Sequence, residues 1–183
     1  MGGCAAVFVP LVPPAFGFDP NALEDAFKQN VKAILICNPS NPSGKVFSPE
    51  ELKIIAEMAV RYDTYVIMDE VYEHIIYAPY KHTYMNSLPG MWERTISCSS
   101  LSKTYSITGW RLGYAIAPKL IMDKIKQYHD FNAVGAAAIL MEAAIVGLEM
   151  PESYYDGLAA HYAHMKELFT GGLKSIGIPF TDP

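Results

Sequence analysis

Residues 95–118, TISCSSLSKTYSITGWRLGYAIAP, decide how the chain is interpreted. Two segments with β propensity, 95–99 and 113–117, flank a turn and an irregular loop that is rich in hydroxyl groups. Lys103 stands in this loop. A lysine there could be a surface residue whose stem covers apolar side chains. At the end of a buried strand, however, its amine can be desolvated and become a nucleophile toward carbonyl compounds.

Length and composition indicate a globular protein. The 183 residues are 51% hydrophobic and 18% charged, unlike a disordered chain. A formal net charge of −5 argues against nucleic acid or an anionic membrane surface as the main partner. The most apolar stretch, 133–150, is interrupted by Glu142 and Glu149, and therefore predicts a buried helix rather than a membrane span. We expect neither a nucleic-acid nor a membrane partner.

The cysteines and histidines do not suggest a metal centre. Cys4, Cys37 and Cys98 are odd in number and widely spaced, so we expect reduced thiols in a cytoplasmic protein. His161 and His164 lie three residues apart on a predicted helix, a spacing that we assign to a solvated helix face. No metal is expected.

Apolar runs alternate with helical patterns along the chain. Strands are expected at residues 31–37, 65–68, 95–99 and 113–117, with shorter candidates at 7–12 and 178–180. Helices are expected after Asp19, Ser48, Pro118 and Pro151 and in the Ala-rich stretch before Met150, with a long surface loop at 74–92. This order predicts an α/β fold with a mainly parallel sheet and helices on both faces.

Polar residues follow three of the predicted strands where each strand ends. They occupy positions 38–41, 69–72 and 100–103. In open α/β sheets the ligand lies beyond the carboxyl ends of the strands, so we expect these segments to converge on one crevice. Packing or loop anchoring is expected to explain Glu70, Tyr105 and Trp110.

The glycine patterns do not fit a nucleotide site. Gly44 resembles the end of a P-loop, but Pro39 occupies the position of its first glycine. Gly109 and Gly113 are four residues apart with no G-x-G before them, so they do not form a dinucleotide fingerprint. The G-x-S-x-G motif of serine hydrolases is also absent from the sequence.

The same polar residues suit a cofactor with an aldehyde, a ring nitrogen, a phenolic oxygen and a phosphate. Lys103 would hold the aldehyde as an imine, and the Asp69 carboxylate would keep the ring nitrogen protonated. Tyr72 and Asn41 would reach the phenolic oxygen. The phosphate would be bound by Ser100, Ser102 and Arg111. A guanidinium offers a planar fork of donors for this purpose.

In this order and spacing, four motifs resemble those of the pyridoxal-phosphate-dependent aminotransferases of class I/II, fold type I. They are NPSNPSG at 38–44, DEVY at 69–72, SLSK at 100–103 and TGWRLGY at 108–114. The resemblance covers essentially the whole chain. It implies the fold of the aminotransferase large domain, in incomplete form, and pyridoxal 5'-phosphate as the cofactor.

The resemblance also implies a role for each residue. Lys103 is the Schiff-base lysine and proton shuttle, and Asp69 pairs with the pyridine nitrogen. Tyr72 and Asn41 bond the ring oxygen, and Asn41 also faces the substrate carboxylate. The implied phosphate contacts are Ser100, Ser102 and Arg111. A cis peptide bond is implied between Asn41 and Pro42.

Residues 1–150 are then part of the large cofactor-binding domain, and 151–183 are a linker helix and the start of the small C-terminal domain. Family members are longer than this chain. By resemblance, further sheet strands, the aromatic residue that stacks on the ring and the arginine that binds the substrate carboxylate lie outside it. Without those strands, the edges of the sheet in this chain would be left unpaired. We therefore expect the chain alone to fold poorly or only as an assembly, with weak or no activity.

Three functions stay open. The leading one is ping-pong transfer of an amino group between an L-amino acid and a 2-oxo acid through the Lys103 Schiff base, in a cytoplasmic homodimer. The second is another pyridoxal-phosphate reaction on the same fold, such as that of a carbon–sulfur lyase, which product analysis would distinguish. The third is a non-catalytic pyridoxal-phosphate-binding regulatory domain, which a basic helix-turn-helix upstream would indicate.

Overall fold

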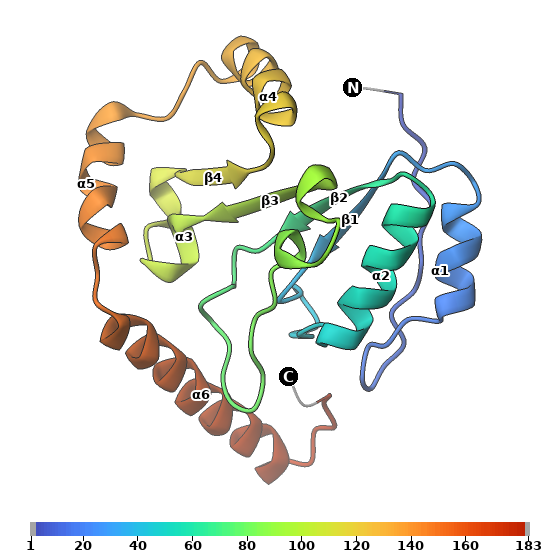
Figure 1. Ribbon diagram of the computed structural model, residues 1–183. Coiled ribbons are helices and arrows are strands. Elements are labelled where there is room, and N and C mark those ends of the chain that lie inside the picture. The colour runs from blue at the N-terminus through green and yellow to red at the C-terminus, as the bar shows by residue number, and fades with distance from the viewer. Residues whose placement is uncertain (1–2, 182–183) are drawn as a thin grey trace.

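A computed structural model describes residues 3–181 (Figure 1). Its centre is a four-stranded sheet in the order β1-β2-β3-β4. The strands are β1 (Ala33–Cys37), β2 (Tyr65–Asp69), β3 (Thr95–Ser100) and β4 (Gly113–Ile116). β1, β2 and β3 are parallel, and β4 runs antiparallel to β3. The expected mainly parallel sheet is confirmed, with one antiparallel strand at its edge.

Helices connect and flank these strands. The α-helices of the described residues are α1 (Pro20–Phe27), α2 (Pro49–Arg61), α3 (Leu101–Thr104), α4 (Lys119–Asn132), α5 (Ala138–Leu148) and α6 (Glu152–Ser175). Short 3-10 turns are η1 (Met85–Ser87), η2 (Trp92–Arg94) and η3 (Thr108–Trp110). In Figure 1, α4, α5 and α6 follow one another around the β4 side of the sheet. No helix in the described part of the chain has the length and apolar character needed to cross a membrane.

The hydrophobic core lies between one face of the sheet and the helices α1 and α2, which lie side by side in Figure 1. Side chains alternate between the two faces of a strand, so Ile36, Val66 and Met68 all point into this core. Leu52 of α2 and Phe27 of α1 pack against them and are almost completely buried. Burial of these side chains is the main stabilising contribution on this side of the sheet.

The opposite face of the sheet is largely open. Leu35 is 70% exposed and Tyr65 48% exposed. α4 borders a groove of about 570 Å³ that Tyr65 and Ile96 also line. Helices therefore lie on both sides of the sheet, as expected, but only one face is closed.

The start of α2 follows the sequence pattern closely. Ser48 is the N-cap, and its Oγ accepts a hydrogen bond from Glu51 N at 3.2 Å. In return, Ser48 N donates to Glu51 Oε2 at 2.9 Å. This capping box satisfies two backbone donors that the first turn would otherwise leave free. It fixes where α2 begins and therefore where the preceding loop must end.

Two short strand predictions are wrong. In residues 7–12 the structure has one isolated bridge, from Val12 to Gly17, and residues 178–180 form no strand. A β-prone segment becomes a strand only when a neighbour pairs with its backbone groups, and neither segment has such a neighbour within the described residues. The loop at 74–92 also differs from the expectation, because Met85 and Met91 are fully buried in the core.

Gly113 allows β4 to approach β3 closely. It pairs with Ser100, and a Cβ placed at Gly113 would lie 2.8 Å from the Ser99 carbonyl oxygen. We expect Gly113→Ala to lower the free energy of unfolding by about 1–3 kcal/mol, because backbone must shift to relieve the overlap. Urea unfolding of the protein encoded by the complete reading frame measures this. Gly171→Ala in α6, where a Cβ meets nothing within 4 Å, is the control and should not destabilise. Equal destabilisation by both substitutions would contradict the prediction.

Candidate active site

The carboxyl ends of three parallel strands lie at one level of the sheet. Cys37 of β1 pairs with Asp69 of β2, and Asp69 pairs with Cys98 of β3. The pairing continues beyond the strands, since Asn38 N donates to Asp69 O at 2.9 Å and Glu70 N donates to Cys98 O at 2.8 Å. The three polar segments expected to converge therefore leave the sheet from the same edge.

The loop after β1 is folded back on itself. Ser40 N donates to Lys45 O and Gly44 N donates to Ser40 O, each at 2.8 Å. The fully buried Asn38 side chain accepts a hydrogen bond from Phe47 N at 3.0 Å through its Oδ1. The peptide bond between Asn41 and Pro42 is cis, as the family resemblance implied. The hydrogen bonds between Ser40, Gly44 and Lys45 close the loop around Asn41.

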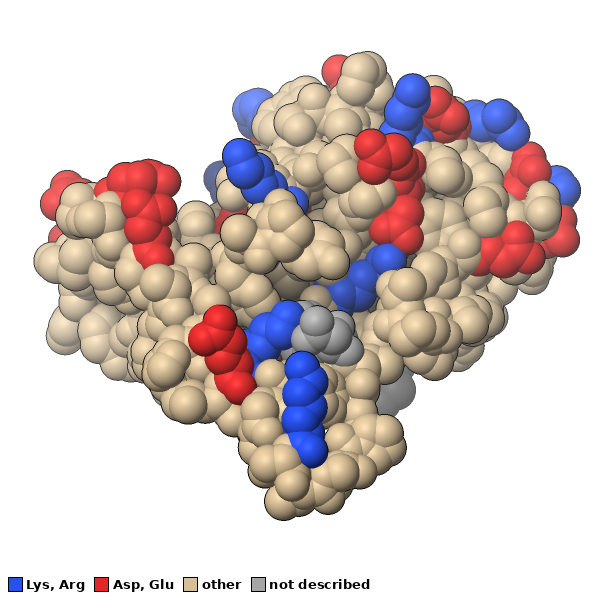
Figure 2. All heavy atoms as spheres, turned by 90° about the horizontal axis from the view of Figure 1, so that it is seen from below, with Lys and Arg blue, Asp and Glu red and all other residues tan. Residues whose placement is uncertain are grey.

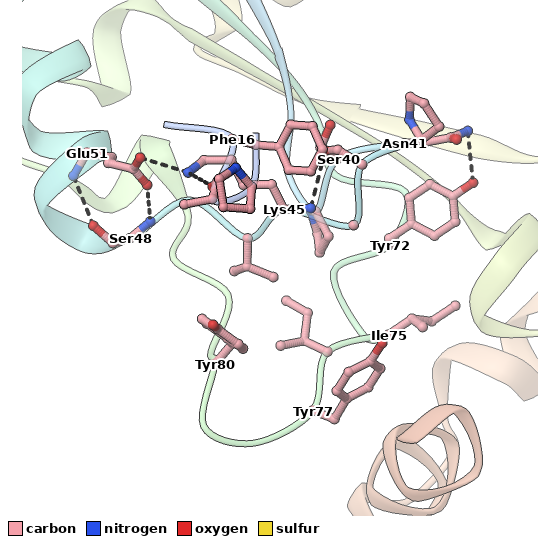
Figure 3. Close-up of a pocket in the computed structure, with 18 residues that line it drawn as sticks. Phe16, Ser40, Asn41, Lys45, Ser48, Glu51, Tyr72, Ile75, Tyr77 and Tyr80 are labelled. Carbon is pink, nitrogen blue, oxygen red and sulfur yellow. Dashed lines mark hydrogen bonds and ion pairs between the residues drawn. The ribbon is translucent and has the colours of Figure 1, made fainter. Parts of the chain in front are cut away.

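Asn41, Tyr72 and Lys103 lie next to one another. Asn41 Nδ2 donates to Tyr72 OH at 3.4 Å, as Figure 3 shows, and Lys103 Nζ lies 5.8 Å from the centre of the Tyr72 ring. Lys103 is half-buried. Within the described residues its amine forms no hydrogen bond or ion pair. A half-buried lysine amine that is not held in an ion pair with a carboxylate can serve as a nucleophile toward a carbonyl group.

Asp69 occupies the end of β2 between two thiols. Its Oδ1 accepts a hydrogen bond from Val71 N at 3.3 Å, and no basic side chain pairs with it within residues 3–181. Burial raises the pKa of Cys37 and Cys98, and the nearby Asp69 charge raises both pKa values further. The carboxylate thus retains acceptor capacity for another donor, which a protonated ring nitrogen would supply.

The phosphate candidates are only partly brought together. Lys103 lies on the one-turn helix α3, where an irregular loop was expected. Ser100 is the N-cap of this helix, and its Oγ lies 2.7 Å from Ser102 Oγ. Arg111 is exposed, and its backbone has the left-handed conformation with φ 56°. Its Nη1 donates to Thr108 O at 3.0 Å. In the described part of the chain no hydrogen bond joins Arg111 to either serine.

A cavity of about 530 Å³ adjoins Asn41 and Tyr72 (Figure 3). The apolar and aromatic part of its lining includes Phe16, Ile75, Ile76, Tyr77 and Tyr80. Lys45 Nζ, at its edge, forms an ion pair with Glu51 Oε1 at 2.7 Å. Because these two charges compensate each other, the cavity wall has little net charge, and it combines apolar, aromatic and hydroxyl-bearing side chains.

Two acidic residues beside Tyr72 contact other parts of the chain. Glu70 is 2% exposed, and its Oε1 lies 3.0 Å from His82 Nε2, so it anchors the long loop as expected. Glu73 was not predicted to have a role, yet three hydroxyl groups donate to its carboxylate. Its position next to Tyr72 was the available signal, but sequence spacing does not reveal partners that lie far along the chain.

The chemistry of these side chains fits pyridoxal phosphate. The site offers a lysine amine that has no counter-ion among residues 3–181, a strand-end carboxylate with spare acceptor capacity, and a phenol hydrogen-bonded to an amide. Ser100 and Ser102 place two neighbouring hydroxyl groups at the start of α3, where the Ser100 hydroxyl also contacts Leu112 O. Together with the mainly parallel α/β sheet, this set defines a pyridoxal-phosphate protein of fold type I.

The comparisons with known proteins are specific. The family model described as "Aminotransferase class I and II" matches residues 1–183. The chain therefore belongs to the class I and II aminotransferases, a family of enzymes that use pyridoxal phosphate.

The chain is similar to curated aminotransferases over most of its length. It is 36% identical over 195 residues to human kynurenine–oxoglutarate transaminase 3, a match that covers 97% of this chain and 43% of the relative. It is 40% identical over 169 residues to the putative aminotransferase YugH of Bacillus subtilis, and this match covers 91% of this chain and 44% of the relative. The chain thus spans less than half the length of these relatives.

Solved structures show the same fold. N-succinyldiaminopimelate aminotransferase from Mycobacterium tuberculosis superimposes with a TM-score of 0.89 at 34% identity, covering 93% of this chain and 45% of the other. The aromatic aminotransferase of Pyrococcus horikoshii gives a TM-score of 0.83 at 32% identity, covering 92% and 46%.

The raised thiol pKa values predict slow alkylation at the site. Cys37 and Cys98 are half-buried, whereas Cys4 is exposed. Because the thiolate is the nucleophile and a raised pKa lowers its population, Cys37 and Cys98 should react with iodoacetamide at least about tenfold more slowly than Cys4 at pH 8. Peptide mass spectrometry of the cofactor-free protein measures the three rates. In urea the rates should converge, and equal rates without urea would show that neither thiol is shielded.

Proposed function

We propose that the protein carrying this chain transfers an amino group between an L-amino acid and a 2-oxo acid in two half-reactions of the ping-pong type. The observation that carries the proposal is the Lys103 amine, half-buried and without a counter-ion within the described residues, beside the hydrogen-bonded pair of Tyr72 and Asn41. Membership of the aminotransferase family supports the reaction class.

Pyridoxal phosphate, when bound, supplies an aldehyde that reacts with amines and a ring that withdraws electrons. Lys103 Nζ is the proposed attachment point and the base that removes a proton from the substrate α-carbon and later returns it. Asp69 is proposed to accept a hydrogen bond from the ring nitrogen and so hold its proton. The absence of a basic partner for Asp69 among the described residues supports this role, since its charge is not already compensated.

The remaining residues are proposed to bind and orient. Tyr72 and Asn41 hold the ring oxygen, and Asn41 also faces the substrate carboxylate. Phosphate binding is assigned to Ser100, Ser102 and Arg111. The guanidinium of Arg111 keeps further N–H groups beyond the one donated to Thr108 O, which leaves it able to bind an anion.

We further propose a cytoplasmic homodimer in which residues 1–150 belong to the large cofactor-binding domain and 151–183 begin the small one. The open sheet face and the exposed Phe131, at 93%, support the proposal that this chain alone folds poorly or only as an assembly, with weak or no activity. Figure 2 shows acidic and basic side chains mixed on one face of the molecule, which supports small-molecule partners rather than nucleic acid.

Lys103→Ala tests the function. In the protein encoded by the complete reading frame, we expect loss of the absorption band of cofactor joined to the lysine as an imine, and a fall in transamination of about 10²–10⁴-fold or more, because the attachment point and the base are both removed. Spectra and 2-oxo acid formation measure the two effects. Lys53→Ala on α2, whose side chain is 74% exposed, is the control and should behave as wild type.

The same experiment separates the alternatives. Release of ammonia and pyruvate without amine transfer would indicate a lyase, and cofactor binding without turnover of any amino acid would indicate a regulatory domain. Normal activity in Lys103→Ala would overturn the assignment of this lysine.

A further inference from the structure

The carboxylate of Glu73 collects hydroxyl groups from three separate parts of the chain. Ser99 Oγ, on β3, donates to Glu73 Oε1 at 2.6 Å. Tyr114 OH, on β4, donates to the same oxygen at 2.7 Å. Tyr84 OH, from the long loop after β2, donates to Oε2 at 2.8 Å. These partners lie 26, 41 and 11 residues away from Glu73 in the sequence.

The protonation states of the Glu73 carboxyl group and its phenol partners favour the hydrogen bonds between them. Burial favours the neutral carboxyl group, but hydrogen bonds from Ser99, Tyr114 and Tyr84 outweigh it and lower the pKa of Glu73. Burial and the Glu73 charge raise the pKa of Tyr114 to about 12. At neutral pH the carboxylate is therefore charged and the phenols keep their protons. Hydrogen bonds to a charged acceptor are stronger than hydrogen bonds between neutral groups. The contacts of Glu73 with Ser99, Tyr84 and Tyr114, here called the Glu73 junction, are therefore strong.

The junction lies directly beside the proposed catalytic residues. Glu73 follows Tyr72, and the turn that carries both is closed by Glu73 N donating to Glu70 O at 2.9 Å and Ile75 N donating to Tyr72 O at 2.8 Å. Ser99 is followed by Ser100, the N-cap of the helix that carries Lys103. The Glu73–Ser99 hydrogen bond thus joins the turn of Tyr72 to the strand that leads to Lys103.

Glu73 and its partners do not line the cavity beside Asn41 and Tyr72. None of the four side chains is among the residues that form its wall in the described structure. The cluster instead joins the turn that carries Tyr72 to β3 through Ser99 and to β4 through Tyr114.

We infer that Glu73 is a positioning residue, which fixes the Tyr72 turn against β3 and β4 and so sets the Tyr72 ring opposite the Lys103 amine. The inference rests on the proposed function for the roles of Tyr72 and Lys103. Misplacing a reacting group by a small distance is costly, because catalysis requires near-attack geometry. Loss of the junction should therefore reduce kcat more than it changes KM.

The test uses Glu73→Gln, which keeps the side-chain volume, together with Tyr84→Phe and Tyr114→Phe, which each remove one donor. In the cofactor-free protein encoded by the complete reading frame, amide hydrogen exchange of residues 69–75 should accelerate about tenfold in Glu73→Gln, and less in each Phe variant. In the loaded enzyme, kcat should fall about tenfold to a hundredfold in Glu73→Gln with KM changed less than threefold.

Matched controls are available on exposed helix surfaces. Glu57→Gln on α2, with a side chain 60% exposed, and Tyr128→Phe on α4, at 74% exposed, change the same groups outside the cluster. Both should leave exchange at 69–75 and kcat as in wild type.

Two results would overturn the inference. One is unchanged exchange at 69–75 in Glu73→Gln. The other is a Glu73→Gln protein of which less folds, while the molecules that do fold keep the wild-type kcat. That result would mean a purely structural role. If the wild-type protein transaminates no amino acid, the proposed function fails, while faster exchange in Glu73→Gln would still support the role of Glu73 in fixing the turn.

Discussion

Backbone hydrogen bonds between β1, β2 and β3 bring Cys37, Asp69 and Cys98 to the same level of the sheet. The candidate site residues that follow these strands, among them Asn41, Tyr72 and Lys103, depend on this register. A shift of β2 by one residue would turn Asp69 toward the core face and Met68 toward the open face, because side chains alternate along a strand. The apolar packing of Val66 and Met68 against α2 therefore also determines where the proposed catalytic carboxylate lies.

Sequence reasoning succeeded where the physical cause is local. The capping box of Ser48 and Glu51 specifies the start of α2 within four residues, and apolar runs identify the parallel strands, although these strands are buried on one face only. The convergence of Asn41, Tyr72 and Lys103 followed from one general rule about strand ends. Whether these side chains hold the cofactor is a proposal, but their proximity is a property of the structure.

Where the outcome depends on distant partners, the sequence was insufficient. Residues 7–12 have a strand-like composition but no neighbouring strand in the described structure. Met85 and Met91 lie in a turn-rich segment, yet both fill the core under the sheet. The short helix of Lys103 was also missed, because its N-cap Ser100 stands in a run of hydroxyl residues where several caps were equally plausible.

The three acidic residues around Tyr72 differ in how much acceptor capacity remains. An ionised carboxylate offers about four lone-pair positions. Glu73 uses three of them for hydroxyl groups, and the buried Glu70 is paired with His82. Asp69 accepts one backbone N–H and has no basic partner among the described residues. Within residues 3–181 the Glu70 side chain also accepts only one hydrogen bond, but it is 2% exposed, whereas Asp69 is half-buried. Asp69 therefore combines spare acceptor capacity with access from outside, which a partner for a protonated ring nitrogen requires.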